Sequence, residues 1–204
     1  MANHNMDITK IKQFWAWFNQ NCNSFGTDFD NTELLTKLDE WINALGDYSW
    51  EIGPGKMKEN ALVISPNGDL ELLEETKEII KNAIDCPGWE YYYAKPPKEW
   101  NMVFDFETSD DKQVEIDASK WEYYLLKYDD GMFEIVIKAP NLVGFDDMDQ
   151  LIAAEITLDG VIGEELRIQT ICEIEVVTAF EKAYKEKTAS IKNLPDHLKS
   201  LAKI

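Results

Sequence analysis

The stretch WEYYLLKYDDGMFEIVI, residues 121–137, carries the clearest structural signal in this chain. It joins two runs rich in aromatic and β-branched residues, Trp121–Tyr128 and Phe133–Ile137, through Asp129-Asp130-Gly131. Asp-Gly between two such runs is typical of a β-hairpin, because glycine tolerates the backbone conformation that a tight turn needs. The sequence therefore predicts two antiparallel strands here.

A helix and a third strand are predicted after this hairpin. Ala139-Pro140-Asn141 has turn chemistry, Asp146–Ile162 has helical spacing, and Ile168–Val177 alternates as a strand does. The expected order is strand, strand, Pro-Asn turn, helix, strand.

The first half of the chain shows the same order. Its segments are the strands Tyr48–Ile52 and Leu62–Ile64, the turn Ser65-Pro66-Asn67, a helix over 72–83 and the strand Trp89–Ala94. The repetition favours a duplicated ββαβ unit with halves 46–100 and 115–178. The alternative is that α+β folds often repeat this order without duplication.

Helical segments are expected at both ends. Residues 1–45 contain two stretches of helical spacing, and 179–204 form a basic helical tail of net charge about +3 within 181–204. This tail packs either on the acidic body of its own chain or on a second subunit. The whole chain, 1–204, is predicted to be a single α+β domain with a mostly antiparallel sheet and packed helices.

The charge of the chain excludes one class of partner and favours another. The 39 acidic and 20 basic side chains give a net charge of −19. Because basic groups supply most of the affinity for phosphates, no nucleic-acid binding is expected, and a basic protein is the expected partner. No apolar run is long enough to span a membrane, and Met1–Asp7 lacks the features of a secretory signal, so the sequence predicts a cytoplasmic protein without membrane contact.

Cysteine and histidine usage argues against several kinds of chemistry. Cys22, Cys86 and Cys172 are widely separated and lack C-x-x-C spacing, so three unpaired thiols are expected. His4 and His197 lie near opposite ends of the chain, which argues against a histidine-based triad or metal site. No cofactor is expected.

Aromatic residues crowd two segments and form the candidate partner-binding surface. Tyr and Trp are enriched at protein interfaces, where they bury a large area at low entropic cost. The alternative is that they form a large aromatic core. The candidate residues are Tyr91, Tyr93, Trp100, Trp121 and Tyr123.

A carboxylate cluster is the candidate site of a second function. Glu155 and Asp159 share a helical face and Glu164 follows, so the three carboxylates could hold Mg²⁺ or Mn²⁺, unless they form a solvated acidic face. Arg167 or Lys95 would then bind an anionic substrate. Arg167, the only arginine, could instead be a structural partner of Glu164 or Glu165.

Five motifs resemble a family of uncharacterised small acidic cytoplasmic proteins of bacteria. They are Trp50–Gly55, Leu62–Gly68, Pro87–Trp89, Lys95–Trp100 and Leu158–Glu164. The resemblance covers about residues 10–178 and implies a small acidic bacterial protein with no assigned reaction and no catalytic residues to carry over.

Three functions follow as expectations. The first is a non-enzymatic acidic binding module, similar to immunity or inhibitor proteins, that engages a basic protein partner. The alternative is a divalent-metal-dependent enzyme that uses the carboxylate cluster on a small anionic substrate. The second alternative is a structural homodimer.

Overall fold

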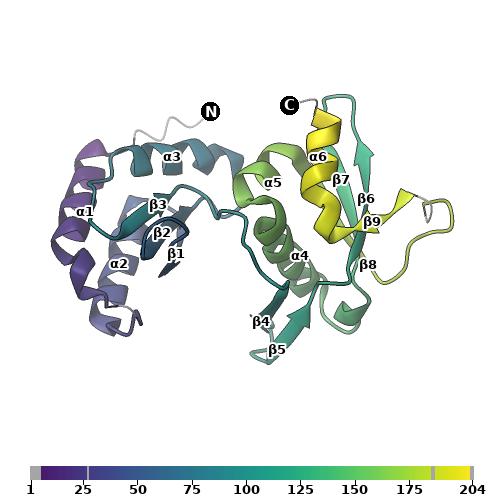
Figure 1. Ribbon diagram of the computed structural model, residues 1–204, viewed down its shortest axis with the longest axis horizontal. Helices are drawn as coiled ribbons and strands as arrows, with labels where there is room; N and C mark the ends of the chain where they lie inside the picture. The colour runs from purple at the N-terminus through teal and green to yellow at the C-terminus, as the bar shows by residue number, and fades with distance from the viewer. Residues whose placement is uncertain (1–5, 27, 185–186, 203–204) are drawn as a thin grey trace. The chain divides into compact units, whose positions relative to one another are not determined.

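The computed structural model describes residues 6–26, 28–184 and 187–202. The chain has the predicted α+β fold, with helices and mostly antiparallel sheets (Figure 1). It divides between Lys95 and Pro96 into two compact units, each with its own hydrophobic core, where the sequence analysis expects one continuous domain. His4 lies outside the described residues.

The first unit contains a three-stranded sheet. Strand β1, Ser49–Pro54, pairs antiparallel with β2, Asn60–Ser65, and β2 pairs in parallel with β3, Trp89–Tyr92. Helix α3, Leu70–Lys81, connects β2 to β3, as a parallel pair requires.

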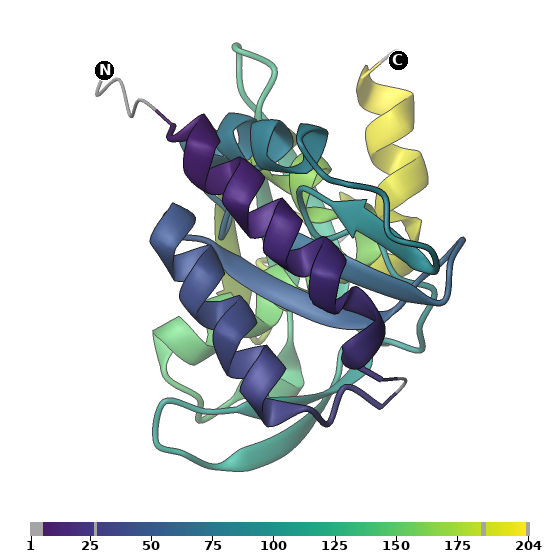
Figure 2. The ribbon, with the colours of Figure 1, turned by 90° about the vertical axis from the view of Figure 1, so that its left-hand side faces the viewer.

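Two N-terminal helices form the rest of this unit and pack side by side (Figure 2). Helix α1, Ile8–Asn21, begins after the capping carboxylate of Asp7, and α2, Thr32–Leu45, begins after Asn31. A short 3₁₀ helix, Cys22–Ser24, follows α1. The core residues of this unit include Phe14, Trp15, Phe18, Leu38, Ile42, Leu62, Ile64 and Trp89.

The prediction of three unpaired thiols is wrong for two of them. Cys22 and Cys86 form a disulfide bond, with Cα atoms 6.8 Å apart and a sequence separation of 64. Both side chains are buried, because the end of α1 packs beside the segment that enters β3. Cys172 is a free, exposed thiol.

The second unit contains a hairpin and a four-stranded sheet. Strands β4, Val103–Glu107, and β5, Gln113–Asp117, pair antiparallel. The larger sheet has the order β8-β7-β6-β9. Its strands are β6, Glu122–Lys127, β7, Phe133–Lys138, β8, Ile171–Val177, and β9, Ala189–Ser190.

Helices α4, Asp147–Ile162, and α5, Glu164–Thr170, connect β7 to β8. The predicted strand from Ile168 therefore starts only at Ile171, because the three residues before it complete a helix. Short 3₁₀ helices cover Pro140–Leu142 and Ile191–Asn193. No helix in the described part of the chain is long and apolar enough to cross a membrane.

The predicted repetition of strand order is present in the structure. In each unit, two antiparallel strands are followed by a helical connection and a third strand that pairs in parallel with the second: β1-β2-α3-β3 and β6-β7-α4-α5-β8. The halves proposed from sequence thus share one topology.

The basic C-terminal segment packs on its own unit. Helix α6, Leu194–Ala202, buries Leu194 and Leu198 in the core beneath the sheet, and β9 pairs with the start of β6. Of the two placements left open, the described residues adopt the intramolecular one.

Candidate protein-binding site

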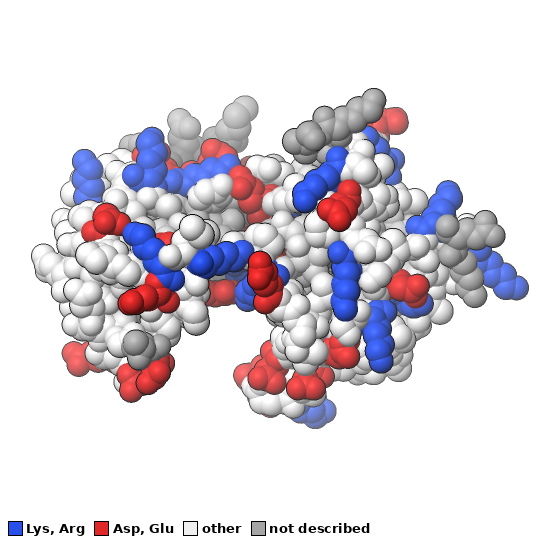
Figure 3. All heavy atoms as spheres, in the orientation of Figure 1, with Lys and Arg blue, Asp and Glu red and all other residues white. Residues whose placement is uncertain are grey.

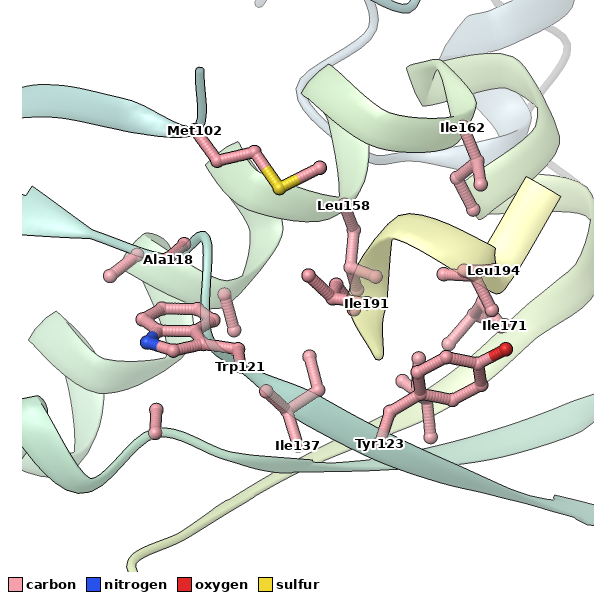
Figure 4. Close-up of a cluster of buried hydrophobic side chains, with 14 of the residues drawn as sticks. Met102, Ala118, Trp121, Tyr123, Ile137, Leu158, Ile162, Ile171, Ile191 and Leu194 are labelled. Carbon is pink, nitrogen blue, oxygen red and sulfur yellow. The ribbon is translucent and has the colours of Figure 1, made fainter. Parts of the chain in front are cut away.

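Two of the five candidate aromatic residues belong to the core. Trp121 and Tyr123 are 1% and 0% exposed, so the prediction that they contact a partner is wrong. Their side chains point into the cluster formed with α4 and α6 (Figure 4). Trp121 Nε1 donates to Asn141 Oδ1 at 2.7 Å, and the Tyr123 hydroxyl lies 2.8 Å from His197 Nδ1.

The other three candidates are half-buried and pack within their own units. Tyr91 contacts the Trp15 ring edge-on, with ring centroids 4.8 Å apart, and donates to the Ile84 carbonyl at 3.1 Å. The Lys77 ammonium lies 5.6 Å from the centre of the Tyr93 ring. Trp100 packs on Gly160 of α4 and on Phe104 in the second unit. The packing of these three side chains within their own units favours the predicted alternative, an aromatic core, over an aromatic partner-binding surface.

The candidate metal ligands Glu155 and Asp159 surround the only arginine. Arg167 Nε donates to Asp159 Oδ1 at 2.5 Å, and its Nη1 donates to Glu155 Oε1 at 3.3 Å. Arg167 therefore has the structural role predicted as the alternative, with Asp159 and Glu155 as its hydrogen-bonded partners and with the charge of the predicted partner Glu164 also acting on it. In the described ranges, no group of three or more His, Cys, Asp or Glu is placed to hold a metal ion.

The electrostatics of this cluster also favour a structural role for Arg167. Burial by itself lowers the pKa of the guanidinium, but the hydrogen bond and charge of Asp159, with the charges of Glu155 and Glu164, raise that pKa above its usual value. Glu164 is fully buried. Lys95, the other candidate anion-binding residue, lies in the first unit with Nζ 4.0 Å from Glu51 Oε1.

Three backbone N–H groups of the β1–β2 connection are occupied by a carboxylate of the chain itself. The Glu90 side chain accepts hydrogen bonds from the backbone N–H groups of Lys56, Met57 and Lys58 in the β1–β2 connection. Because these donors are engaged, this loop offers no phosphate site.

A strongly acidic surface lies on the hairpin of β4 and β5, which we call the acidic hairpin. Its side chains alternate between two faces, as in any strand. Phe106 and Ile116 are buried in the core, and Phe104 and Val114 pack against that core. The opposite face and the turn carry six exposed carboxylates: Asp105, Glu107, Asp110, Asp111, Glu115 and Asp117.

The strand register brings carboxylates of the acidic hairpin together. Asp105 lies directly opposite Glu115, and Glu107 lies opposite Gln113, whose amide donates to it at 2.6 Å. Lys112 is the only basic residue in 103–117. Figure 3 shows this concentration of acidic side chains where Figure 1 places β4 and β5.

Local hydrogen bonds keep carboxylates of this hairpin ionised. The Lys112 ammonium and the Thr108 hydroxyl lower the pKa of Asp110, and Ser119 lowers the pKa of Asp117 through its side chain and its backbone N–H. Asp110 and Asp117 therefore keep their negative charges throughout the neutral pH range.

A cavity of about 370 Å³ lies beside the turn of the acidic hairpin. Its walls combine apolar side chains with carboxylates at the start of α4. The Ser109 backbone N–H donates to buried Asp149 at 3.0 Å, and the Ser109 hydroxyl donates to Asp146 at 2.6 Å, which anchors the turn to the helix. The apolar residues that line the cavity include Val114, Val143 and Phe145, and the carboxylates include Asp110, Asp146 and Asp149.

The acidic hairpin is not among the candidate binding sites predicted from the sequence. The pairs Asp105/Glu107 and Glu115/Asp117 are spaced two residues apart, with apolar residues between them. That spacing is the signal of a half-buried strand with an acidic outer face and could have identified the surface.

Comparisons with known proteins leave the family open. No family model matches this chain, and neither a curated protein nor a solved structure matches it. The resemblance to a family of small acidic bacterial proteins therefore stays a prediction.

Proposed function

We propose that this protein is a non-enzymatic binding module that engages a basic protein partner through the acidic hairpin. The observation that carries the proposal is the composition of the outward face of β4 and β5: four carboxylates from two paired strands with no basic side chain among them. Charge complementarity of this kind accelerates association and selects oppositely charged partners.

The cavity beside the turn supplies the apolar contact that such an interface needs. Charged rim contacts set the rate and specificity of binding, whereas well-packed apolar anchors supply most of the affinity. Val143 is 67% exposed at the cavity and Met148 is 61% exposed on the adjoining first turn of α4. We expect an apolar or long basic side chain of the partner to occupy this place.

The test is capture of proteins from a lysate of the source cells on the immobilised full chain, at low and at high salt. The variant that we call the hairpin variant combines Asp105→Asn, Glu107→Gln, Glu115→Gln and Asp117→Asn. If four exposed ion pairs are lost, affinity falls by at least about fourfold, because each pair contributes about 0.2–1 kcal/mol.

A matched control separates the site from the overall charge. The variant that we call the control variant combines Asp28→Asn, Glu33→Gln, Asp47→Asn and Glu59→Gln, four exposed positions of the first unit, and changes the net charge by the same amount. A basic protein captured by the wild type and the control variant but not by the hairpin variant supports the proposal. Equal capture by all three chains contradicts it.

The Cys22–Cys86 disulfide bond argues against the cytoplasmic location that the sequence predicts. Disulfides persist in oxidising compartments and are rare in the cytoplasm.

A further inference from the structure

We propose that the outward face of α4, together with the neighbouring cavity, is the docking site for a basic amphipathic helix of the partner protein. This inference rests on the proposed function and adds the kind of segment through which the partner binds. The outward face carries Met148, Leu151 and Ile152, which we call the apolar stripe.

Helix α4 is apolar on two sides, and the core covers only one of them. Ala153 and Leu158 are buried in the core of the second unit. On the other side, Met148 and Ile152 are exposed, and Leu151 between them is half-buried. A helix at the surface of a soluble protein normally turns polar residues outward. The apolar stripe is therefore a surface suited to contact with a partner.

The cavity beside the hairpin turn extends this apolar surface. Val143 and Phe145 line it just before α4 begins, and Val114 lines it from β5. Hydrogen bonds from Ser109 join the hairpin turn to the start of α4, which lies beside the hairpin in Figure 1. A cavity of about 370 Å³ is within the size range of ligand pockets, so it has room for an anchoring side chain.

Acidic side chains around the apolar stripe select a basic occupant. Residues 139–166 contain seven carboxylates and no lysine or arginine. Asp146 and Asp147 are exposed at the start of α4, and Asp110 is exposed at the hairpin turn. Among the described residues that line the cavity, Lys112 is the only basic one, and Asp110 engages it at 2.6 Å. A second copy of this chain would bring like charges together, so we assign the site to a basic partner.

The geometry of α4 favours a helix as the occupant. Beyond its first turn, the backbone N–H groups of α4 are satisfied within the helix, so an extended segment would gain no main-chain hydrogen bonds from it. A second helix has a satisfied backbone of its own and packs its side chains between those of α4. The residues of the apolar stripe have the i, i+3, i+4 spacing through which helices contact one another.

The experiment measures binding of two fluorescently labelled synthetic peptides to the full chain, by fluorescence anisotropy at low ionic strength. Both peptides contain leucine and lysine in equal numbers and span about five helical turns. In the helical peptide, leucine recurs with the period of a helix, and in the alternating peptide it recurs with the period of a strand. Because composition and charge are the same, charge alone predicts equal affinities.

Matched variants separate the apolar stripe from other exposed apolar residues. The stripe variant combines Met148→Gln and Ile152→Gln, at positions that are 61% and 38% exposed. The apolar control variant combines Leu70→Gln and Ile84→Gln in the first unit, at positions that are 58% and 42% exposed. Neither pair changes the net charge. Val143→Thr lies outside the helices and tests the same surface without a change in α4.

We expect the wild type and the apolar control variant to bind the helical peptide at least about tenfold more tightly than the alternating peptide. The stripe variant should lose about tenfold in affinity for the helical peptide, and Val143→Thr about twofold to threefold. Wild-type affinity in the stripe variant overturns the inference. Equal affinities of the wild type for the two peptides, or no binding of the helical peptide, also overturn it.

The hairpin variant distinguishes failure of this inference from failure of the proposed function. If this variant binds both peptides at least about fourfold more weakly than the wild type, while the stripe variant binds like the wild type, only the inference fails. If the hairpin variant binds both peptides as tightly as the wild type, the proposed function fails and the inference fails with it. Light scattering without peptide should show a monomer, and a dimer that the stripe variant dissociates would assign the apolar stripe to a second copy and overturn the inference.

Discussion

Asp105 and Glu115 lie directly opposite each other on one rung of the β4–β5 hairpin, so two exposed carboxylates of equal charge face the same solvent. Opposite charges at such a position stabilise a sheet, whereas like charges destabilise it. The protein therefore keeps a local instability at the surface that we propose for binding.

Replacing one member of this pair should stabilise the fold. We expect Glu115→Gln to raise the free energy of unfolding by about 0.2–1 kcal/mol, because the repulsion with Asp105 is removed while the side-chain size is kept. Urea denaturation at low salt measures this change. Added salt should stabilise the wild type more than the variant, since salt screens exposed charges.

The control for this change is Glu99→Gln, an exposed carboxylate outside the strands of the hairpin. If Glu99→Gln stabilises the protein as much as Glu115→Gln does, the gain comes from the lower net charge. That result would contradict the proposed repulsion between Asp105 and Glu115.

Gly160 of α4 leaves room for the ring of Trp100. A methyl group at this position would lie 2.7 Å from Trp100 Cε2, closer than any normal contact. We expect Gly160→Ala to destabilise the protein by about 1–3 kcal/mol, although alanine favours helices over glycine by about 1 kcal/mol. Thermal unfolding with and without the substitution measures the effect.

A second background identifies the cause of that loss. In a Trp100→Ala chain the added methyl group meets open space, so Gly160→Ala should there be neutral or stabilising. The same loss in both backgrounds would show that the indole ring is not the reason for glycine at this position.

The Cys22–Cys86 bond predicts the thiol content of the native protein. We expect iodoacetamide to label one thiol, Cys172, in the denatured protein without reductant. After reduction, it should label three thiols. Mass spectrometry counts the added groups. Three labelled thiols without reductant would contradict the disulfide and support the cytoplasmic location.

Loss of this bond should destabilise the first unit. Closing a loop of this length restricts the unfolded chain by about 4 kcal/mol in the loop-entropy model. Denaturant unfolding of a Cys22→Ser/Cys86→Ser chain measures the loss, and Cys172→Ser, an exposed free thiol, should leave the stability unchanged.

Half-buried Tyr91 and buried Tyr123 predict a loss of stability at alkaline pH. Burial, with the charge of Asp85, raises the pKa of Tyr91 to about 12, and burial raises the pKa of Tyr123 to about 12. In the unfolded chain both titrate near about 10. Between about pH 10 and 12 the unfolded state releases protons that the folded state keeps, so stability is full below pH 10 and falls as the pH rises through this range.

Circular dichroism and tyrosinate absorbance, followed together from neutral to alkaline pH, test this behaviour. We expect Tyr123→Phe to reduce the steepness of the alkaline loss of stability, because one of the tyrosines with a raised pKa no longer titrates. Ionisation of all tyrosines near pH 10 in a chain that keeps its helical signal would contradict the prediction.

Local elements of this fold could be predicted from neighbouring residues. Asp129-Asp130-Gly131 indicates the β6–β7 hairpin, because turn geometry depends on a few adjacent dihedral angles. The spacing of Ile11, Phe14, Trp15 and Phe18 likewise indicates α1. Alternation around Tyr123 and Tyr124 correctly indicates a strand.

The face of a strand that becomes the core could not be predicted in the same way. Alternation places Trp121 and Tyr123 on one face of the sheet, but only the packing of α4 and α6 decides that this face is buried. The partner of Arg167 and the pairing of Cys22 with Cys86 likewise depend on how separate segments meet.

The sequence by itself thus determined most helices, the β6–β7 hairpin, the repeated order of elements and the acidic charge, since these depend on residues close together in the chain. Only the tertiary structure decided that the conspicuous aromatics of β6 lie inside and that the carboxylates of β4 and β5 line one exposed face. The physical reason is that burial is set by contacts between distant segments, and those contacts leave no local pattern in the sequence.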